Sequence, residues 1–160
     1  MESLEALLEL LTPLARLGRP ALAAIDGRCG SGKSTLAGLA AHRLGCPLFH
    51  MDDFFLPPAL RTPERYAAPG GNVHYERVEA ELLRPLRETG AACFRPFDCR
   101  SMDFSAPIRA ELTGLALVEG SYALGVLCAD VPGTVIAVKK DSPLIFGYGQ
   151  GCNFIASDVP

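Results

Sequence analysis

The sequence predicts an α/β fold with a doubly wound parallel sheet that is incomplete in its C-terminal half. Residues 21–26 form a short apolar run, and residues 34–44 after it repeat apolar side chains with the period of a helix. Two further apolar runs, 48–51 and 115–118, end directly before acidic residues. Short buried strands that alternate with helical segments indicate a parallel sheet with helices on both faces.

A glycine-rich segment between the first strand and its helix fits the pattern G-x-x-x-x-G-K-[ST]. Its residues are Gly27, Arg28, Cys29, Gly30, Ser31, Gly32, Lys33, Ser34 and, directly after the pattern, Thr35. The glycines let backbone N–H groups surround an anion, and the helix start adds the positive end of its dipole. In such a loop Lys33 reaches the β- and γ-phosphates and the Ser34 hydroxyl ligates Mg²⁺. The fold is therefore expected to be of the P-loop NTPase type, the alternative being a plain glycine-rich turn.

Composition restricts the kinds of partner that the chain can have. The 160 residues have 49% hydrophobic content, a net charge of -3 and a pI near 5.6, so a basic field for nucleic acid is lacking. No apolar run is long enough to span a membrane. The acidic N-terminus is unlike a secretory signal, so we expect a cytoplasmic protein whose six cysteines are reduced.

The remaining elements follow from apolar spacing and from proline and glycine. Residues 3–17 are expected to form an amphipathic helix, because leucines recur on one face. Residues 54–71 hold four prolines and are expected to form a long functional loop. A helix is expected over 72–86, a short strand over 93–98 and an irregular loop over 100–108.

Acidic residues follow the second and third strands. Asp52 and Asp53 come after the second strand, and Glu119 ends the third. The carboxyl ends of parallel strands meet at one rim of the sheet, so these acids are expected beside the phosphate loop. The alternative for each acid is a helix cap or a turn residue.

Four segments together resemble the uridine kinase-like group of P-loop kinases over about residues 1 to 125. These segments are Ile25 to Thr35, His50 to Phe55, Arg95 to Asp98 and Val118 to Tyr122. The resemblance implies transfer of the ATP γ-phosphoryl group, with Mg²⁺, to a hydroxyl of a nucleoside or a similar small molecule. It also implies that Asp52 accepts the proton of the attacking hydroxyl, and that Asp52 and Glu119 order the metal with Ser34.

The resemblance further implies which residues face the acceptor. They are Asp53, Phe55, His74, Tyr75, Phe97 and Asp98. Aromatic rings can stack on a base and acids can bond to ribose hydroxyls. His74 stands where close relatives are expected to carry an acid, and a solvated residue at a helix start is the alternative.

The kinase pattern stops near Gly125. A kinase of this group continues with another core strand and a lid helix bearing arginines, whereas no arginine follows Gly125 and the only cations are Lys139 and Lys140. Residues 134–160 instead resemble an internal piece of the glutaminase domain of glutamine-fructose-6-phosphate aminotransferase. We therefore expect a nucleotide-binding core over 1–125 and a separate tail over 126–160, in which 135–138 and 144–146 form a hairpin.

Three functions are consistent with this pattern. The first is a kinase of the uridine kinase-like class, and the second is an ATP-binding remnant without turnover, because lid arginines are missing. The third is a glutamine amidotransferase fragment. That family uses an N-terminal cysteine exposed after loss of Met1, whereas this chain has Glu2. Oligomeric state is not indicated by any of these features.

Overall fold

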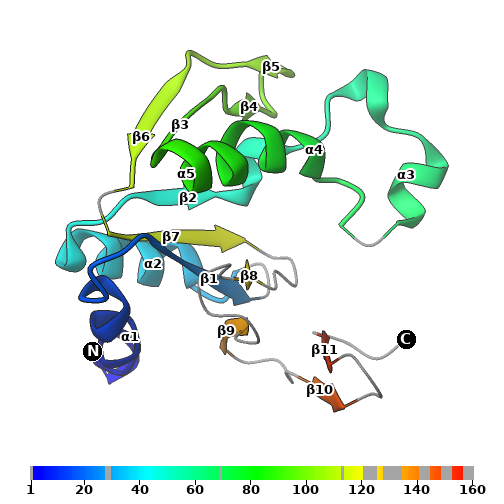
Figure 1. Ribbon diagram of the computed structural model, residues 1–160. Helices are drawn as coiled ribbons and strands as arrows, with labels where there is room; N and C mark the ends of the chain where they lie inside the picture. The colour runs from blue at the N-terminus through cyan, green and yellow to red at the C-terminus, as the bar shows by residue number, and fades with distance from the viewer. Residues whose placement is uncertain are drawn as a thin grey trace.

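The computed structural model describes residues 2–27, 30–68, 70–112 and 114–120, and four further strands between residues 126 and 156. One central sheet has helices on both of its faces (Figure 1). This is the predicted α/β architecture.

The central sheet has five strands in the order β2-β7-β1-β9-β8. They are β2 (Leu48–His50), β7 (Leu115–Gly120), β1 (Ala21–Gly27), β9 (Val135–Lys140) and β8 (Val126–Leu127). The first four are parallel, whereas the two-residue β8 runs antiparallel to β9. The parallel sheet is confirmed, and it is only partly formed on the β8 side.

Two helices cover one face of the sheet. They are α1 (Glu2–Ala15) and α2 (Lys33–Leu44), and both lie close to their predicted positions. Alternate residues of β1 and β7 point toward these helices, as a strand period of two requires. The buried residues of this layer are Leu7, Leu11, Ala21, Ala23, Ile25, Ala37, Ala40, Ala41, Leu115 and Leu117.

A second helical segment covers the opposite face (Figure 1). It runs continuously through α4 (Tyr75–Arg77), the π-helical η3 (Val78–Leu83) and α5 (Arg84–Thr89), where residues 72–86 were predicted. Pro85 has no N–H and therefore cannot donate a helical hydrogen bond, and the helix accommodates this by π-helical turns directly before it. Ala116 and Val118 of β7 pack toward this side, together with Phe49, Phe54 and Phe94.

The segment predicted as a long loop, 54–71, contains two short helices. They are η2 (Pro58–Leu60) and α3 (Pro63–Ala67), and a further short helix, η1 (Met51–Phe54), ends at the first residue of the segment. Thr62 caps α3, because its hydroxyl accepts the Arg65 N–H at 3.1 Å. The loop prediction therefore missed helices that prolines begin rather than exclude.

The predicted irregular region, 100–108, contains β5 (Asp103–Phe104) and the first residue of β6 (Ile108–Glu111). Each of these strands forms a small antiparallel pair with a strand that precedes the region: β6 with β3 (Ala91–Phe94), and β5 with β4 (Phe97–Asp98). The predicted strand 93–98 is thus split in two. The pairing of β3 with β6 joins segments that are far apart in the chain, so the residue pattern within each segment did not indicate it.

The tail pairs differently from the prediction. Strand β9 lies in the central sheet beside β1, where Lys139 and Lys140 are opposite Asp26 and Gly27. Strand β10 (Ile145–Tyr148) pairs with β11 (Asn153–Ala156) in a separate antiparallel sheet. The predicted hairpin between 135–138 and 144–146 is wrong, because β9 meets an open edge of β1 instead.

Candidate functional site

The phosphate loop joins the end of β1 to the start of α2. Gly30 and Gly32 have φ angles of +76° and +82°, in the left-handed region that favours glycine. No side chain caps α2, and the Gly32 carbonyl accepts the first helical bond from Leu36 N–H at 2.9 Å. The N–H groups of the first turn therefore stay open to an anion. The predicted residues Arg28 and Cys29 lie outside the described residues.

The Ser31 hydroxyl is buried in this loop and has no hydrogen-bond partner among the described residues. A buried hydroxyl without a partner costs about 1–3 kcal/mol. Lys33 and Thr35, beside it at the helix start, likewise make no side-chain hydrogen bond or ion pair within the described part of the chain. The loop thus offers a hydroxyl and a cation to an anionic ligand.

Glu119 lies beneath the start of α2 and is the one charged residue in the buried core of the described chain. Its Oε2 accepts a hydrogen bond from the Ser34 hydroxyl at 3.0 Å. Its Oε1 lies 2.6 Å from Nδ1 of His50. The predicted meeting of the loop serine and the acid of the third strand is present in the structure.

Ser34 Oγ and Glu119 Oε2 are oxygen atoms that could serve as ligands of Mg²⁺. Mg²⁺ takes oxygen ligands at about 2.0–2.1 Å in octahedral geometry, so neighbouring ligands lie about 2.9 Å apart. The 3.0 Å between Ser34 Oγ and Glu119 Oε2 fits that spacing. In the described part of the chain, no three His, Cys, Asp or Glu side chains gather to hold a metal by themselves. Mg²⁺ usually binds through one or two carboxylates plus substrate phosphates, which is what this arrangement would allow.

Asp52 and Asp53 lie in the helical turn η1, directly after β2. Asp52 is exposed and Asp53 is half-buried. Burial raises the pKa of Asp53; His50 acts in the opposite direction, and the charges of Asp52 and Glu119 raise it further. The charge of Asp53 therefore interacts with that of Glu119. Asp52 and Asp53 directly follow β2, at the carboxyl rim of the sheet where they were predicted.

Backbone pairing brings part of the predicted acceptor side together. Phe55 forms an isolated antiparallel bridge with Val73, and His74 N–H donates to the Phe54 carbonyl at 2.7 Å. Strand β4, which carries Phe97, packs against η1. These contacts place Phe55, His74 and Phe97 around the turn that holds Asp52 and Asp53.

The side chains of Phe97 and Asp98 are engaged within the protein. Phe97 is buried and packs edge-on against Phe104, with ring centroids 5.5 Å apart. Asp98 accepts hydrogen bonds from Arg100 N–H at 2.8 Å and from the Ser101 hydroxyl at 3.0 Å, and these bonds lower its pKa. Phe97 therefore offers no open ring face for a base, and Asp98 stabilises its own turn.

His74 and Tyr75 belong to an ionic cluster centred on Arg65. The Arg65 guanidinium bonds to both carboxylate oxygens of Glu76, at 2.8 and 2.7 Å, and lies 3.8 Å from the centre of the Tyr75 ring. Nδ1 of His74 lies 3.0 Å from Glu76 Oε2. Gly71 comes so close to Arg65 that a Cβ there would lie 1.8 Å from the Arg65 carbonyl oxygen. This cluster fastens the loop 54–71 to the start of α4.

Residue patterns did not identify His50 as part of the site. Its register opposite Glu119 in the β2–β7 pair brings the two side chains together. His50 ends β2 and Glu119 stands one residue before the end of the parallel strand β7, but the order of the strands in the sheet was needed to show that the two are neighbours.

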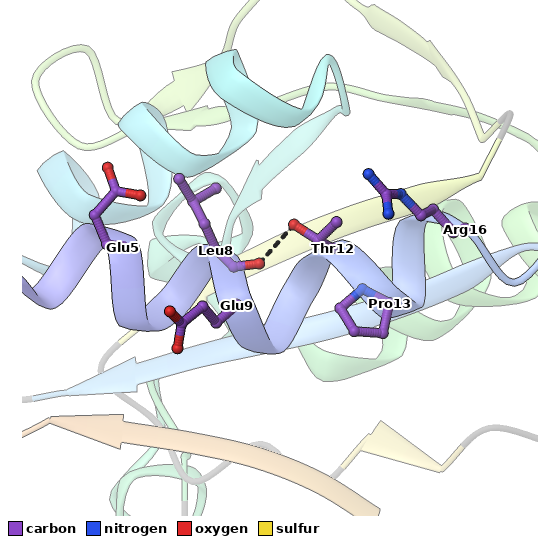
Figure 2. A pocket seen from close by; sticks show the side chains of 6 residues that line it. All are labelled: Glu5, Leu8, Glu9, Thr12, Pro13 and Arg16. Atoms are coloured by element: carbon purple, nitrogen blue, oxygen red, sulfur yellow. Dashed lines mark hydrogen bonds between the residues drawn. The ribbon is translucent and has the colours of Figure 1, made fainter.

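A hollow in the described part of the chain lies elsewhere, along α1. Figure 2 shows its lining residues: Glu5, Leu8, Glu9, Thr12, Pro13 and Arg16. All of them belong to α1 or directly follow it, and none is a predicted site residue. Among the described residues, no helix has both the length and the apolar character to cross a membrane.

Comparison with curated sequences finds similarity to glutamine–fructose-6-phosphate aminotransferases. The chain is 55% identical over 53 residues to that of Clostridium tetani, covering 33% of this chain and 9% of the relative. It is 63% identical over 43 residues to that of Caldanaerobacter subterraneus subsp. tengcongensis, covering 27% and 7%. The chain thus spans less than a tenth of these relatives. No model of a known protein family matches it.

Comparison with solved structures finds kinases. A "possible uridine kinase" from Bacillus stearothermophilus aligns with a TM-score of 0.61 at 22% identity, over 75% of this chain and 70% of its own. A "putative fructose transport system kinase" from Silicibacter sp. TM1040 gives 0.62 at 25% identity, over 76% and 65%. D-glycerate 3-kinase from Cryptococcus neoformans var. grubii gives 0.50 at 16% identity, over 81% and 54%.

The fold is that of P-loop kinases. Both resemblances drawn from the sequence are confirmed, one by structural similarity and one by sequence similarity. The 43-residue aminotransferase match is longer than the segment 126–160, so it includes residues that precede the predicted tail.

Proposed function

We propose that this chain binds ATP through residues 27–35 and transfers the γ-phosphoryl group to a hydroxyl of a small molecule. One observation carries the proposal: the 3.0 Å contact between the Ser34 hydroxyl, at the start of α2, and Oε2 of Glu119, at the end of a neighbouring strand. This pair of oxygens stands at the carboxyl rim of the sheet, beside the phosphate loop. The kinase fold of the structural neighbours supports the same reaction class.

Each residue of the rim has a role in phosphoryl transfer. In this proposal Lys33 would hold the β- and γ-phosphates, and Ser34 and Glu119 would hold Mg²⁺, which would supply positive charge beside the phosphate oxygens. Asp52 takes the proton of the acceptor hydroxyl as its oxygen bonds to the γ-phosphorus, while the bond from phosphorus to the bridging oxygen breaks and ADP leaves.

The internal contacts of the acceptor side favour a compact acceptor. A uridine-like nucleoside needs a ring face for its base, whereas the Phe97 ring is buried and Arg65 lies over the Tyr75 ring. A sugar or a hydroxy acid needs only a hydroxyl at Asp52. The names of two structural neighbours, a fructose transport system kinase and a glycerate kinase, point in the same direction.

The alternative is an ATP-binding protein without turnover. Arginines that could act on the transferring phosphoryl group are engaged elsewhere: Arg65 with Glu76, Arg77 with Glu81, and Arg95 with the carbonyls of Phe104 and Ser105. Loss of an arginine that stabilises the transition state costs about 10³ to 10⁵ in rate. Under this alternative, ATP binds and no acceptor is phosphorylated.

Calorimetry and an acceptor panel separate the two. The purified chain is titrated with ATP and Mg²⁺ and then assayed on nucleosides, sugars and hydroxy acids. We expect Lys33→Ala to abolish binding, with the exposed Arg43→Ala of the same helix as the control. We expect Asp52→Asn to keep binding and lower turnover about 10²–10⁴-fold, with Asp103→Asn as the control. Failure of the unaltered chain to bind ATP would refute both functions.

A further inference from the structure

His50 is the last residue of β2 and lies directly opposite Glu119 in the parallel β2–β7 pair. Its Nδ1 lies 2.6 Å from Glu119 Oε1. A carboxylate oxygen can only accept, so Nδ1 carries the proton of this bond. The side chain of His50 is 43% exposed and that of Glu119 is 5% exposed, so this bond connects a buried acid to the open rim.

The two oxygens of Glu119 have different partners. Oε1 faces His50, whereas Oε2 accepts from Ser34. A carboxylate turns easily about its last torsion, which is broad and nearly two-fold. With Oε1 fixed by a short charge-assisted bond, Oε2 stays turned toward Ser34.

We propose that His50 is a positioning residue, which holds the Glu119 carboxylate so that Oε2 and the Ser34 hydroxyl face one Mg²⁺. The inference rests on the proposed function. His50 does not touch the nucleotide in this scheme and acts only through Glu119. Outer partners of this kind typically contribute 10- to 100-fold to metal affinity.

A merely structural role for His50 predicts something different. If the ring only filled space at the end of β2, any side chain of similar size would replace it. Asparagine and glutamine separate the two roles, because the amide N–H of asparagine can reach the position of Nδ1, whereas that of glutamine reaches the position of Nε2. The pair His50→Asn and His50→Gln therefore tests the Nδ1–H bond itself.

The measurement is the Mg²⁺-dependence of ATP affinity on the full chain, by calorimetry with Mg²⁺ and with chelator. We expect His50→Gln to lower the gain from Mg²⁺ 10- to 100-fold while the affinity for metal-free ATP stays unchanged. We expect His50→Asn to retain most of the gain in ATP affinity from Mg²⁺ that the unaltered chain has. Mn²⁺ binding with ADP, followed by electron paramagnetic resonance, gives the same comparison without turnover.

Two results would overturn the inference alone. One is a gain from Mg²⁺ that is equal in His50→Gln and in the unaltered chain. The other is an equal loss in His50→Asn and His50→Gln. If the unaltered chain gains nothing from Mg²⁺, the proposed function itself is wrong and this inference falls with it.

Discussion

The hydroxyl of Ser34 donates a 3.0 Å hydrogen bond to Oε2 of Glu119, a residue 85 positions further along the chain. The bond joins the phosphate loop to β7, which is the third strand of the central sheet in chain order and lies beside β1 in that sheet. One buried carboxylate thereby connects the two segments that the nucleotide site requires.

Ser34→Ala tests this connection. We expect ATP affinity in Mg²⁺ to fall at least tenfold and affinity in chelator to change little, because only the metal-dependent part needs the hydroxyl. Titration calorimetry measures both affinities. Ser3→Ala, an exposed serine of α1, serves as the control. An equal fall in Mg²⁺ and in chelator would show that Ser34 does not act through a metal.

Gly71→Ala tests the loop that carries Arg65. The added Cβ would lie 1.8 Å from the Arg65 carbonyl oxygen, so the backbone must shift, and we expect a loss of about 1–3 kcal/mol in the free energy of unfolding. Gly38→Ala is the matched control, because nothing lies within 4 Å of its Cβ in α2. There the free energy of unfolding should rise, by up to about 1 kcal/mol. Urea unfolding followed by circular dichroism measures both variants.

Phe54→Ala tests the core under the acidic turn. Phe54 is fully buried and stacks on Phe94 with ring centroids 5.0 Å apart. We expect a loss of about 3–5 kcal/mol in the free energy of unfolding, from lost burial and the cavity left behind. Tyr66→Ala, at a half-exposed ring, should change it by no more than about 0.5 kcal/mol. Similar losses in the two variants, measured in urea, would contradict the packing described.

The Arg65–Glu76 pair predicts a pH dependence of stability. The Arg65 guanidinium lowers the pKa of Glu76 from 4.5 to about 2, and a bond from His74 adds to this. A lowered pKa in the folded state stabilises the protein above the ordinary pKa, and that contribution is lost as the pH falls from about 4.5 to 2.

We therefore expect Glu76→Gln to unfold at lower urea than the unaltered chain at pH 7 and to differ less from it at pH 3. The difference at pH 7 should stay near 1 kcal/mol or below, because Glu76 is half-exposed. Glu88→Gln is the control, since Glu88 is exposed and forms no ion pair in the described part of the chain. A pH-independent difference would contradict the ionic pairing.

Strand β9 can be tested by proline. Ala137 pairs with Ala24 of β1, and proline in a strand with neighbours on both sides disrupts the ladder. We expect Ala137→Pro to lower the thermal unfolding midpoint clearly and to weaken ATP binding, because β1 leads into the phosphate loop. Ala156→Pro, in the separate β10–β11 pair, should have a smaller effect on both. Equal effects would argue against β9 as part of the central sheet.

Local patterns predicted what depends on neighbours in the chain. The helical period of residues 34–44, the apolar run before Gly27 and the acid that ends residues 115–118 gave β1, α2 and β7 near their observed bounds. Glycine chemistry predicted the left-handed turns at Gly30 and Gly32. The short helices within 54–71 were missed, because prolines read as loop signals also begin helices.

By itself, the sequence determined the phosphate loop, the acids at the ends of two strands and the P-loop type of α/β fold, because each follows from spacing within a few residues. Only the tertiary structure decided that His50 bonds to Glu119 and that β9 joins β1. Those outcomes depend on strand order and register across many residues. The spacing of apolar residues within a segment does not specify these contacts, because they depend on which strands pair and in which register.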